Sequence, residues 1–271
     1  MNVLISTNAK AFIGAELVVY SFMQHHKNVH WYVTTLNVAI NDEYGEKHVH
    51  DGISDDFAYE LKKIVKYFDS NSTIEVIDTS DLFIKELAGS VNDLSPFTPF
   101  AAIRLMSDLI VPEDVHDLLY LDVDTIVRQN IEADYIKYTT IDGPYAAHII
   151  KEACSHKGEM ISSVIFFNMD ICRKTNFFKK ARENYKKFQY RFPDQMAIRD
   201  TADPVDIEEN LNYMRPLEDA EDTIKIYHFS NKLAPKIYNI GWEQFFIRFP
   251  QFTDIKEGVE LVNSLNFNII E

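Results

Sequence analysis

The stretch LLYLDVDTIV, residues 118–127, joins an apolar run to two aspartates one residue apart and then to a second apolar run. The first run has the length of a strand and polar flanks, which favours a buried central strand. Residues i and i+2 of an extended chain point the same way, so we expect Asp122 and Asp124 to aim their carboxylates at one point as the strand ends. Open α/β sheets bind ligands at the carboxyl ends of their parallel strands.

This acidic pair predicts a metal site. Two carboxylates this close repel each other, and burial raises the cost. A bound divalent cation relieves the repulsion, and oxygen ligands suit Mg²⁺ or Mn²⁺. The plain alternative is a strand end followed by an ordinary polar turn, since Asp-x-Asp alone is a common pattern.

The composition of the 271 residues narrows the class of protein. Their number suffices for one large or two small domains, and a hydrophobic content of 46% supplies a sizeable core. The formal net charge of −15 disfavours nucleic acid or an anionic membrane surface as the main partner, because both require a basic surface. A nucleotide ligand remains compatible, since a metal ion, an arginine and backbone amides bind phosphates inside acidic proteins.

The sequence also gives an expectation for the compartment. No stretch reaches the roughly 18 uninterrupted apolar residues that span a bilayer. The first residues lack the basic region and cleavage site of a signal peptide, and nothing marks Cys154 and Cys172 as a disulfide pair. We therefore expect a cytoplasmic protein without an integral membrane segment, and peripheral membrane association stays open.

The first part of the chain alternates between strand and helix patterns. Apolar β-branched runs and helical spacing of apolar residues predict, in order, a strand at 1–7, a helix at 13–26, a strand at 29–36, a helix at 57–68 and a strand at 72–77. This order is typical of a nucleotide-binding α/β half with both helices over the sheet. Residues 37–45 are expected to form a polar connection.

Further elements are predicted downstream. Helices are expected at 81–89, 101–109, 177–192, from 193 onward, at 241–249 and at 255–265, and strands at 143–150, 164–168 and 224–229. Asp194 is placed to cap the helix that starts at 193. Arg104 lies among apolar residues of the helix before the acidic strand, so it is either an ordinary exposed arginine or a group that reaches a phosphate near the metal.

Over roughly residues 2–236 the chain resembles glycosyltransferase family 8, the retaining glycosyltransferases with the GT-A fold. The resemblance rests on segments in the family's order: VLISTN (3–8), SPFTPFAAIRL (95–105), LLYLDVDTIV (118–127), SSVIFFNMD (162–170), FPDQM (192–196) and HFSNKLAPK (228–236). It implies a single α/β domain, residues 1–271, with a mixed central sheet. A Rossmann-like nucleotide-sugar-binding half at about 1–125 would be fused to an acceptor half at about 126–271.

The resemblance also implies roles for individual residues. Asp122, Asp124 and His228 look like the metal ligands, and two carboxylates with an imidazole suit Mn²⁺, or Mg²⁺. Asp194 and Gln195 resemble the catalytic pair beside the donor sugar. The donor-binding residues by the same resemblance are Ser6, Thr7, Asn8, Arg104, Asp122, Val123, Asp124, Ser162, Ser163, His228 and Lys232.

Several positions depart from the family's pattern. Asn8 stands where many members have Asp, and Ile161-Ser162-Ser163 replaces Asn-Ala-Gly. In the last segment Asn231 replaces a Gly, Lys236 a Trp and Ala234 the Lys that assists the leaving diphosphate. Lys232 and Lys236 are the candidates to substitute for that lysine, each two positions away.

The function implied by the resemblance is metal-dependent transfer of glucose or galactose from a UDP-sugar to a glycan or glycoprotein, with retention of configuration. Two alternatives remain. Asp122-Val123-Asp124-Thr125 after an apolar strand also resembles the nucleophile motif of haloacid-dehalogenase-type phosphohydrolases. The altered segments also fit a catalytically weakened protein that binds a sugar nucleotide without turnover.

Overall fold

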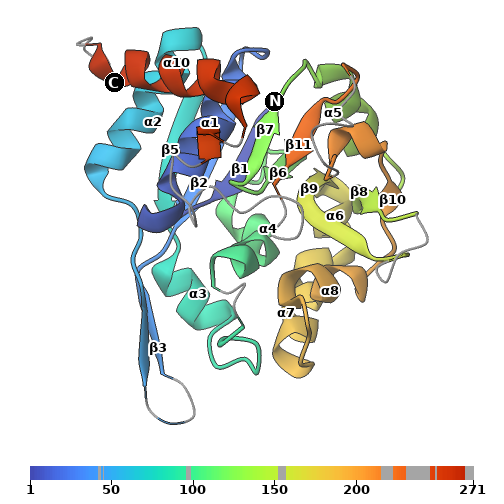
Figure 1. Ribbon diagram of the computed structural model, residues 1–271. Helices are drawn as coiled ribbons and strands as arrows, with labels where there is room; N and C mark the ends of the chain where they lie inside the picture. The colour runs from blue at the N-terminus through green and yellow to red at the C-terminus, as the bar shows by residue number, and fades with distance from the viewer. Residues whose placement is uncertain are drawn as a thin grey trace.

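A seven-stranded sheet with strand order β10-β8-β9-β6-β1-β2-β5 forms the centre of the molecule (Figure 1). The computed structural model describes residues 1–41, 44, 46–95, 99–151, 157–214, 222–229, 245–247 and 249–265. The strands of this sheet are β1 (Asn2–Ser6), β2 (His30–Thr35), β5 (Thr73–Asp78), β6 (Asp117–Leu121), β8 (Tyr145–Ile149), β9 (Met160–Asn168) and β10 (Val205–Asp206). The predicted mixed α/β architecture is confirmed.

The amino-terminal half has the predicted alternation of strands and helices. Strands β6, β1, β2 and β5 are parallel neighbours, so their carboxyl ends meet at one edge. One face of the sheet is covered by helices whose apolar residues join a single core: α1 (Phe12–Met23), α2 (Asp55–Phe68), α5 (Glu132–Thr139) and α10 (Thr253–Ser264). The acidic first turn of α2 favours its start, and the Ser54 side chain accepts a hydrogen bond from the backbone N–H of Phe57.

The opposite face is covered by a second set of helical segments. They are α3 (Ser80–Glu86), the 3₁₀ helix η2 (Phe100–Met106), α4 (Ser107–Ile110), α6 (Met169–Thr175), α7 (Phe177–Lys187) and α8 (Pro193–Arg199). Strand β6 divides its side chains between the two cores: Leu119 and Leu121 face the first, Leu118 and Tyr120 the second. A strand buried on both faces is expected to be continuously apolar, which explains the run before the aspartates.

Strand β9 makes the sheet mixed, because it is antiparallel to both β6 and β8. Two smaller sheets complete the described elements. Strand β7 (Thr125–Val127) pairs antiparallel with β11 (Ile226–His228), and β3 (Val38–Asn41) pairs antiparallel with β4 (Lys47–His50). Short 3₁₀ helices lie at η1 (Ala9–Ala11), η3 (Glu209–Leu211) and η5 (Pro250–Phe252).

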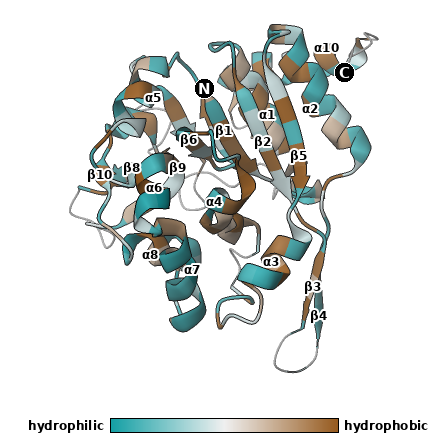
Figure 2. Cartoon of the chain, turned by 180° about the vertical axis from the view of Figure 1, so that it is seen from behind, coloured by the Kyte–Doolittle hydropathy of each residue, from teal (hydrophilic) through white to brown (hydrophobic). Residues whose placement is uncertain are grey.

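Four expectations about elements need correction. Residues 37–45 contain strand β3, and the β3–β4 hairpin projects from the body of the molecule (Figures 1 and 2). The segment predicted as a helix at 101–109 begins as the 3₁₀ helix η2 and has only one α turn, α4. The helix predicted to reach 192 ends at Lys187, and β9 begins four residues before the predicted strand, at Met160 rather than 164.

Three expectations concern residues that are only partly described. Of the helix expected at 241–249, residues 245–247 are helical and most of the others lie outside the described residues. Cys172 is free and buried, whereas Cys154 lies outside the described residues. Within the described part of the chain, no helix has the length and apolar character needed to cross a bilayer.

Candidate functional site

Asp122 and Asp124 lie on a tight turn between β6 and β7. The sequence predicted an extended strand end, but residues 123 and 124 form a turn, and the Asp122 carbonyl accepts hydrogen bonds from the Thr125 backbone N–H (3.2 Å) and hydroxyl (2.8 Å). Strand β9 fixes the turn from the other side, because the Asp122 N–H donates to the Ser163 carbonyl at 2.8 Å. The expected proximity of the two carboxylates is therefore achieved by a turn rather than by strand alternation.

Helix α1 packs against this turn through a glycine. A Cβ atom added to Gly14 would lie 2.1 Å from the Val123 carbonyl oxygen, a distance that no side chain tolerates. Gly14 therefore permits the start of α1 to approach the Asp-x-Asp turn backbone to backbone. The turn is held between this helix and β9.

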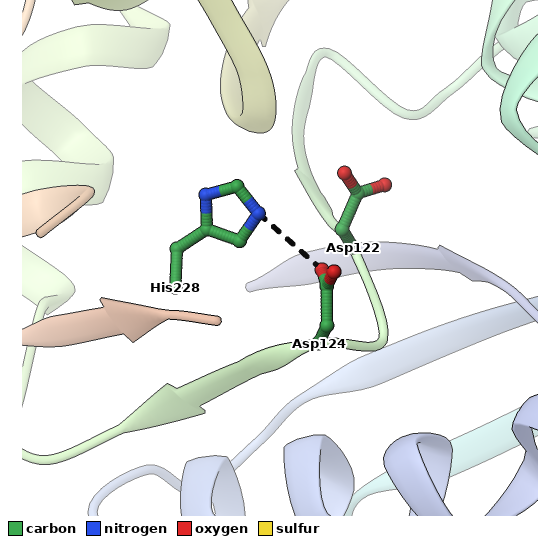
Figure 3. A group of neighbouring side chains, drawn as sticks. All are labelled: Asp122, Asp124 and His228. Atoms are coloured by element: carbon green, nitrogen blue, oxygen red, sulfur yellow. Dashed lines mark ion pairs between the residues drawn. The ribbon is translucent and has the colours of Figure 1, made fainter. Parts of the chain in front are cut away.

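His228 completes a cluster with the two aspartates (Figure 3). The antiparallel pairing of β11 with β7 places His228 opposite Thr125, and the Phe229 N–H donates to the Asp124 carbonyl at 2.8 Å. One ligand atom from each of Asp122, Asp124 and His228 lies within 4.8 Å of the others, and His228 Nε2 is 3.5 Å from Asp124 Oδ1. Asp124 and His228, which are 104 positions apart in the chain, thus meet at the carboxyl edge of the sheet.

The donor set of this cluster fits a divalent cation. Asp124 and His228 are buried, whereas the Asp122 side chain remains 27% exposed, so the cluster is open on the Asp122 side. Two carboxylates and an imidazole suit Mn²⁺ or Mg²⁺ and leave coordination positions for other oxygen ligands. Among the described residues, this is the one group of histidine, cysteine, aspartate and glutamate side chains with such spacing.

Arg104 contacts the cluster through Asp122 and is buried, so of the two alternatives for this residue the ordinary exposed arginine is wrong. Its Nη2 lies 2.7 Å from Asp122 Oδ1 and its Nε 3.2 Å from Asp194 Oδ2. Nη1 donates to the Ser162 carbonyl, and the guanidinium lies 4.1 Å from the centre of the Tyr120 ring. Burial opposes the charge, but Asp122, Tyr120 and Asp194 outweigh it and raise the pKa of Arg104.

Tyr120 is a member of this site that the sequence reasoning did not identify. Its hydroxyl donates to Asp122 Oδ1 at 2.8 Å, and burial raises the pKa of Tyr120 well above its usual range, which keeps the proton on the oxygen. The signal was present in the sequence, because residues two apart on a strand share a face. Tyr120 and Arg104 together orient one oxygen of Asp122.

Asp194 is not the N-cap residue that the sequence predicted, although it lies in the first turn of α8. Phe192 is the N-cap residue of α8 and makes no side-chain cap bond, while Asp194 is buried against Arg104. Burial raises the pKa of Asp194 and the charge of Arg104 opposes that shift. Arg104 thus bridges the acidic turn and the start of α8.

Gln195 and Ser162 connect α8 to the end of β9. The Ser162 hydroxyl lies 3.3 Å from Asp194 Oδ2 and 3.5 Å from Gln195 Oε1, and the Ser162 N–H donates to Gln195 Oε1 at 3.3 Å. The structure therefore brings both predicted catalytic residues next to the serine segment. Ser163 lies next to the metal cluster instead, with its hydroxyl 3.0 Å from His228 Nδ1.

The predicted nucleoside-binding residues lie at the same edge of the sheet. Ser6 ends β1, the parallel neighbour of β6, and its hydroxyl is 2.8 Å from the Thr34 hydroxyl. Thr7 is buried and its N–H donates to the Thr34 carbonyl. Asn8 caps η1 by accepting from the Ala11 N–H at 2.7 Å, a bond that Asp in its place would also make. Lys232, with Asn231, Ala234 and Lys236, lies outside the described residues.

Comparison with known proteins identifies the fold. No family model matches the chain, and no curated protein matches it. Among solved structures, it is similar to the bifunctional glycosyltransferase WbbM, with a TM-score of 0.65, 13% identity and coverage of 95% of this chain. The chain spans about half of WbbM, 51% of its length.

Two further structures share this architecture. The galactosyltransferase LgtC, solved with donor and acceptor sugar analogues, has a TM-score of 0.63 and 15% identity, with 99% of this chain and 98% of LgtC covered. GlyE of Streptococcus pneumoniae has a TM-score of 0.58 and 15% identity, with 95% and 64% covered. The chain has the GT-A fold of these glycosyltransferases, which confirms the fold implied by the sequence resemblance.

Proposed function

We propose that this chain is a metal-dependent retaining hexosyltransferase that moves glucose or galactose from a UDP-sugar to a hydroxyl of a glycan or glycoprotein. The observation that supports it most is the convergence of Asp122, Asp124 and His228 at the carboxyl edge of a GT-A sheet. Open α/β sheets bind nucleotides at this edge. Ser6 ends β1 and Thr7 follows it at the same edge, where we expect the nucleoside to bind.

The metal site is the first part of the proposal. Asp122, Asp124 and His228 would hold Mn²⁺, or Mg²⁺, which when bound neutralises charge on the diphosphate as the glycosidic bond breaks. Arg104 and Tyr120 hold Asp122 in one orientation, so this ligand does not have to be ordered when the ion binds. Arg104 would act on the diphosphate electrostatically, across Asp122, rather than by direct contact.

The second part concerns the route of transfer. Gln195 is a neutral amide and a poor nucleophile, and its Oε1 accepts from the Ser162 N–H. Asp194 is buried and engaged by Arg104. Neither residue offers a free carboxylate to attack the sugar, so we favour front-face attack in which the leaving phosphate accepts the proton of the acceptor hydroxyl. The departing sugar would have oxocarbenium character.

A thermal-shift screen of UDP, UDP-glucose and UDP-galactose, with and without Mn²⁺, tests the proposal. Ligands that bind only the folded state raise its stability in proportion to RT ln(1 + [L]/Kd), so stabilisation should require nucleotide and metal together. Asp124→Asn should abolish both this shift and transfer, because it removes one of the charged ligands. Turnover like that of the wild type in Asp124→Asn at limiting metal would contradict the proposal.

The same screen separates the two alternatives. Binding of UDP and Mn²⁺ without transfer or hydrolysis, across a broad acceptor panel, would favour a catalytically weakened binding protein. Release of phosphate from a generic aryl phosphate would favour the phosphohydrolase. The geometry gives that reading less support, because the third member of the cluster is His228 rather than a further carboxylate.

A further inference from the structure

Two adjacent serines of β9 serve different parts of the site. Successive residues of a strand point to opposite faces, so Ser162 and Ser163 diverge. The Ser162 hydroxyl faces Asp194 and Gln195, whereas the Ser163 hydroxyl faces His228. Ser163 stands where the family pattern has a glycine, which has no side chain to offer. This chain therefore has a contact to its imidazole ligand that a glycine cannot make.

The hydrogen bonds of Ser163 run in one direction. Its Oγ lies 3.0 Å from Asn212 Oδ1 and 3.0 Å from His228 Nδ1, and all three residues are buried. A carboxamide oxygen only accepts, so the single hydroxyl proton of Ser163 goes to Asn212. The hydroxyl oxygen must then accept from His228, which places the imidazole proton on Nδ1. Nε2 keeps its lone pair and faces Asp124.

We propose that Ser163 is a positioning residue that fixes His228 in the Nδ1–H tautomer and so presents Nε2 to the cation. Metal-ligating histidines need a partner on the other ring nitrogen to set tautomer and ring orientation. Ser163 supplies that partner, and Asn212 sets the direction of the Ser163 hydroxyl. The inference rests on the proposed function, because it assumes that the cluster holds a cation.

Asn212 is fixed by backbone bonds and not only by Ser163. Its N–H donates to the Glu209 carbonyl at 3.0 Å, just after η3. The next residue, Tyr213, donates to the Ile226 carbonyl and accepts from the His228 N–H, at 3.0 and 2.8 Å. Asn212 and His228 are therefore held on adjacent backbone segments. These backbone bonds fix the positions of Asn212 and His228 on either side of Ser163.

The opposite amide orientation gives the rival arrangement. Within the described part of the chain, Asn212 Nδ2 is buried and has no hydrogen-bond partner. With the amide reversed, Nδ2 would donate to Ser163, whose proton would then go to Nδ1. His228 would carry its proton on Nε2 and could not ligate a cation through that atom. The two arrangements predict different tautomers, which are measurable.

Nitrogen NMR of metal-free protein with ¹⁵N-labelled histidine, recorded at about pH 8, distinguishes them. His228→Asn assigns the resonance by its loss. The wild type should show the Nδ1–H tautomer at His228, and Ser163→Ala should show a mixture or the Nε2–H form. An Nε2–H tautomer in the wild type, or an unchanged spectrum in Ser163→Ala, would overturn the inference.

Electron paramagnetic resonance titration with Mn²⁺ measures the consequence. Ser163→Ala should weaken binding by roughly 10- to 100-fold, as removal of such outer partners does at other metal sites. Ser163→Thr keeps the hydroxyl and should restore most of the affinity. Ser162→Ala, one residue away but facing α8, should leave Mn²⁺ affinity unchanged. Equal affinity in Ser163→Ala and the wild type would overturn the inference.

Two controls keep the result interpretable. Circular dichroism and thermal unfolding establish that each variant folds, and Ser163→Cys, which keeps the size but is a weak hydrogen-bonding group, replaces Ser163→Ala if that variant does not. A wild type that binds no Mn²⁺ would overturn the proposed function. The NMR measurement would still decide whether Ser163 sets the tautomer, so the two failures are distinguishable.

Discussion

Helix α1 lies between two regions that each bury a carboxylate. At its start, Gly14 contacts the Asp-x-Asp turn of the candidate site, in which Asp194 is buried against Arg104. Further along, Glu16 is buried and accepts a hydrogen bond from Asn263 of α10 at 2.8 Å. Burial raises the pKa of both carboxyl groups, but the opposing group is the Arg104 cation at Asp194 and only an amide at Glu16.

The two regions differ in the group that faces the buried carboxylate. At the site, Arg104 lies between Asp122 and Asp194, and its charge opposes the rise that burial causes in the pKa of Asp194. At the contact between α1 and α10, burial and the nearby Glu60 raise the pKa of Glu16 from 4.5 to about 7. The site therefore pairs its buried carboxylate with a buried cation, whereas the contact between α1 and α10 pairs Glu16 with a neutral amide.

Removal of Arg104 should have the largest effect. Arg104→Met leaves Asp122 and Asp194 facing each other without a cation, and removal of one partner from a buried ion pair costs about 4 kcal/mol. Urea unfolding measures the loss, and metal-dependent transfer should fall with it. Arg104→Lys, which keeps the charge but not the planar fork, should be intermediate. A loss below about 1 kcal/mol in Arg104→Met would show that the placement of Asp122 and Asp194 does not depend on this cation.

The second effect is a dependence of stability on pH at Glu16. Its pKa is higher in the folded state than the ordinary 4.5, so the folded state binds the proton more tightly. Stability from this group is complete below the unfolded pKa and is lost as pH rises towards 7, a change of about 3 kcal/mol. Glu16→Gln keeps an acceptor for Asn263 and removes the titration.

Urea unfolding at about pH 5 and pH 8 tests this expectation. Wild type and Glu16→Gln should be close in stability at the lower pH, and the variant should be more stable at the higher pH. Glu60→Gln is the matched control, because it removes only the smaller contribution of a neighbouring charge from α2. Parallel pH profiles for wild type and Glu16→Gln would show that Glu16 does not titrate in this range.

Much of the fold could be predicted from the sequence because its signals are local. The apolar run of β6 reflects burial on both faces, and the periodicity of α2 reflects burial on one face. Helix α1 is apolar almost throughout because nearly all of its residues are buried. The hairpin of β3 and β4 has no such signal, since it projects from the body and its side chains are mostly exposed. Its pairing comes from backbone bonds, which residue patterns do not record.

Some residues of the site could likewise be predicted from the sequence, and others could not. Asp122 and Asp124 follow a readable strand, so their proximity could be predicted even though a turn produces it. The position of Asp194 could not, because a local capping preference indicated one role and a long-range contact with Arg104 imposes another. The sequence did not indicate that Asn212 contacts Ser163, because that contact depends on the backbone of β11 next to Asn212.

A smaller effect is expected where α1 meets the site. Gly14→Ala would place a Cβ 2.1 Å from the Val123 carbonyl oxygen, so helix or turn must move. Overpacking of this kind costs about 2 kcal/mol, and displacement of the turn should also weaken Mn²⁺ binding. Gly143→Ala is the control, since its Cβ would meet its nearest neighbour, in Val205, at 3.8 Å. Equal Mn²⁺ affinity in Gly14→Ala and the wild type would separate the helix contact from the metal site.

The smallest effect should come from Ser162. Ser162→Ala removes the hydroxyl near Asp194 and Gln195 but leaves the backbone bonds of residue 162 to Gln195 and Arg104 intact. Loss of one such hydrogen bond costs about 1 kcal/mol, and the Arg104 cation still compensates Asp194. If Gln195 must be held for transfer, kcat should fall a few-fold while Mn²⁺ affinity stays constant. A change in metal affinity instead would mean that the two sides of β9 are coupled through the strand. The contacts of Ser162 with Asp194 and Gln195 would then influence the metal ligands as well.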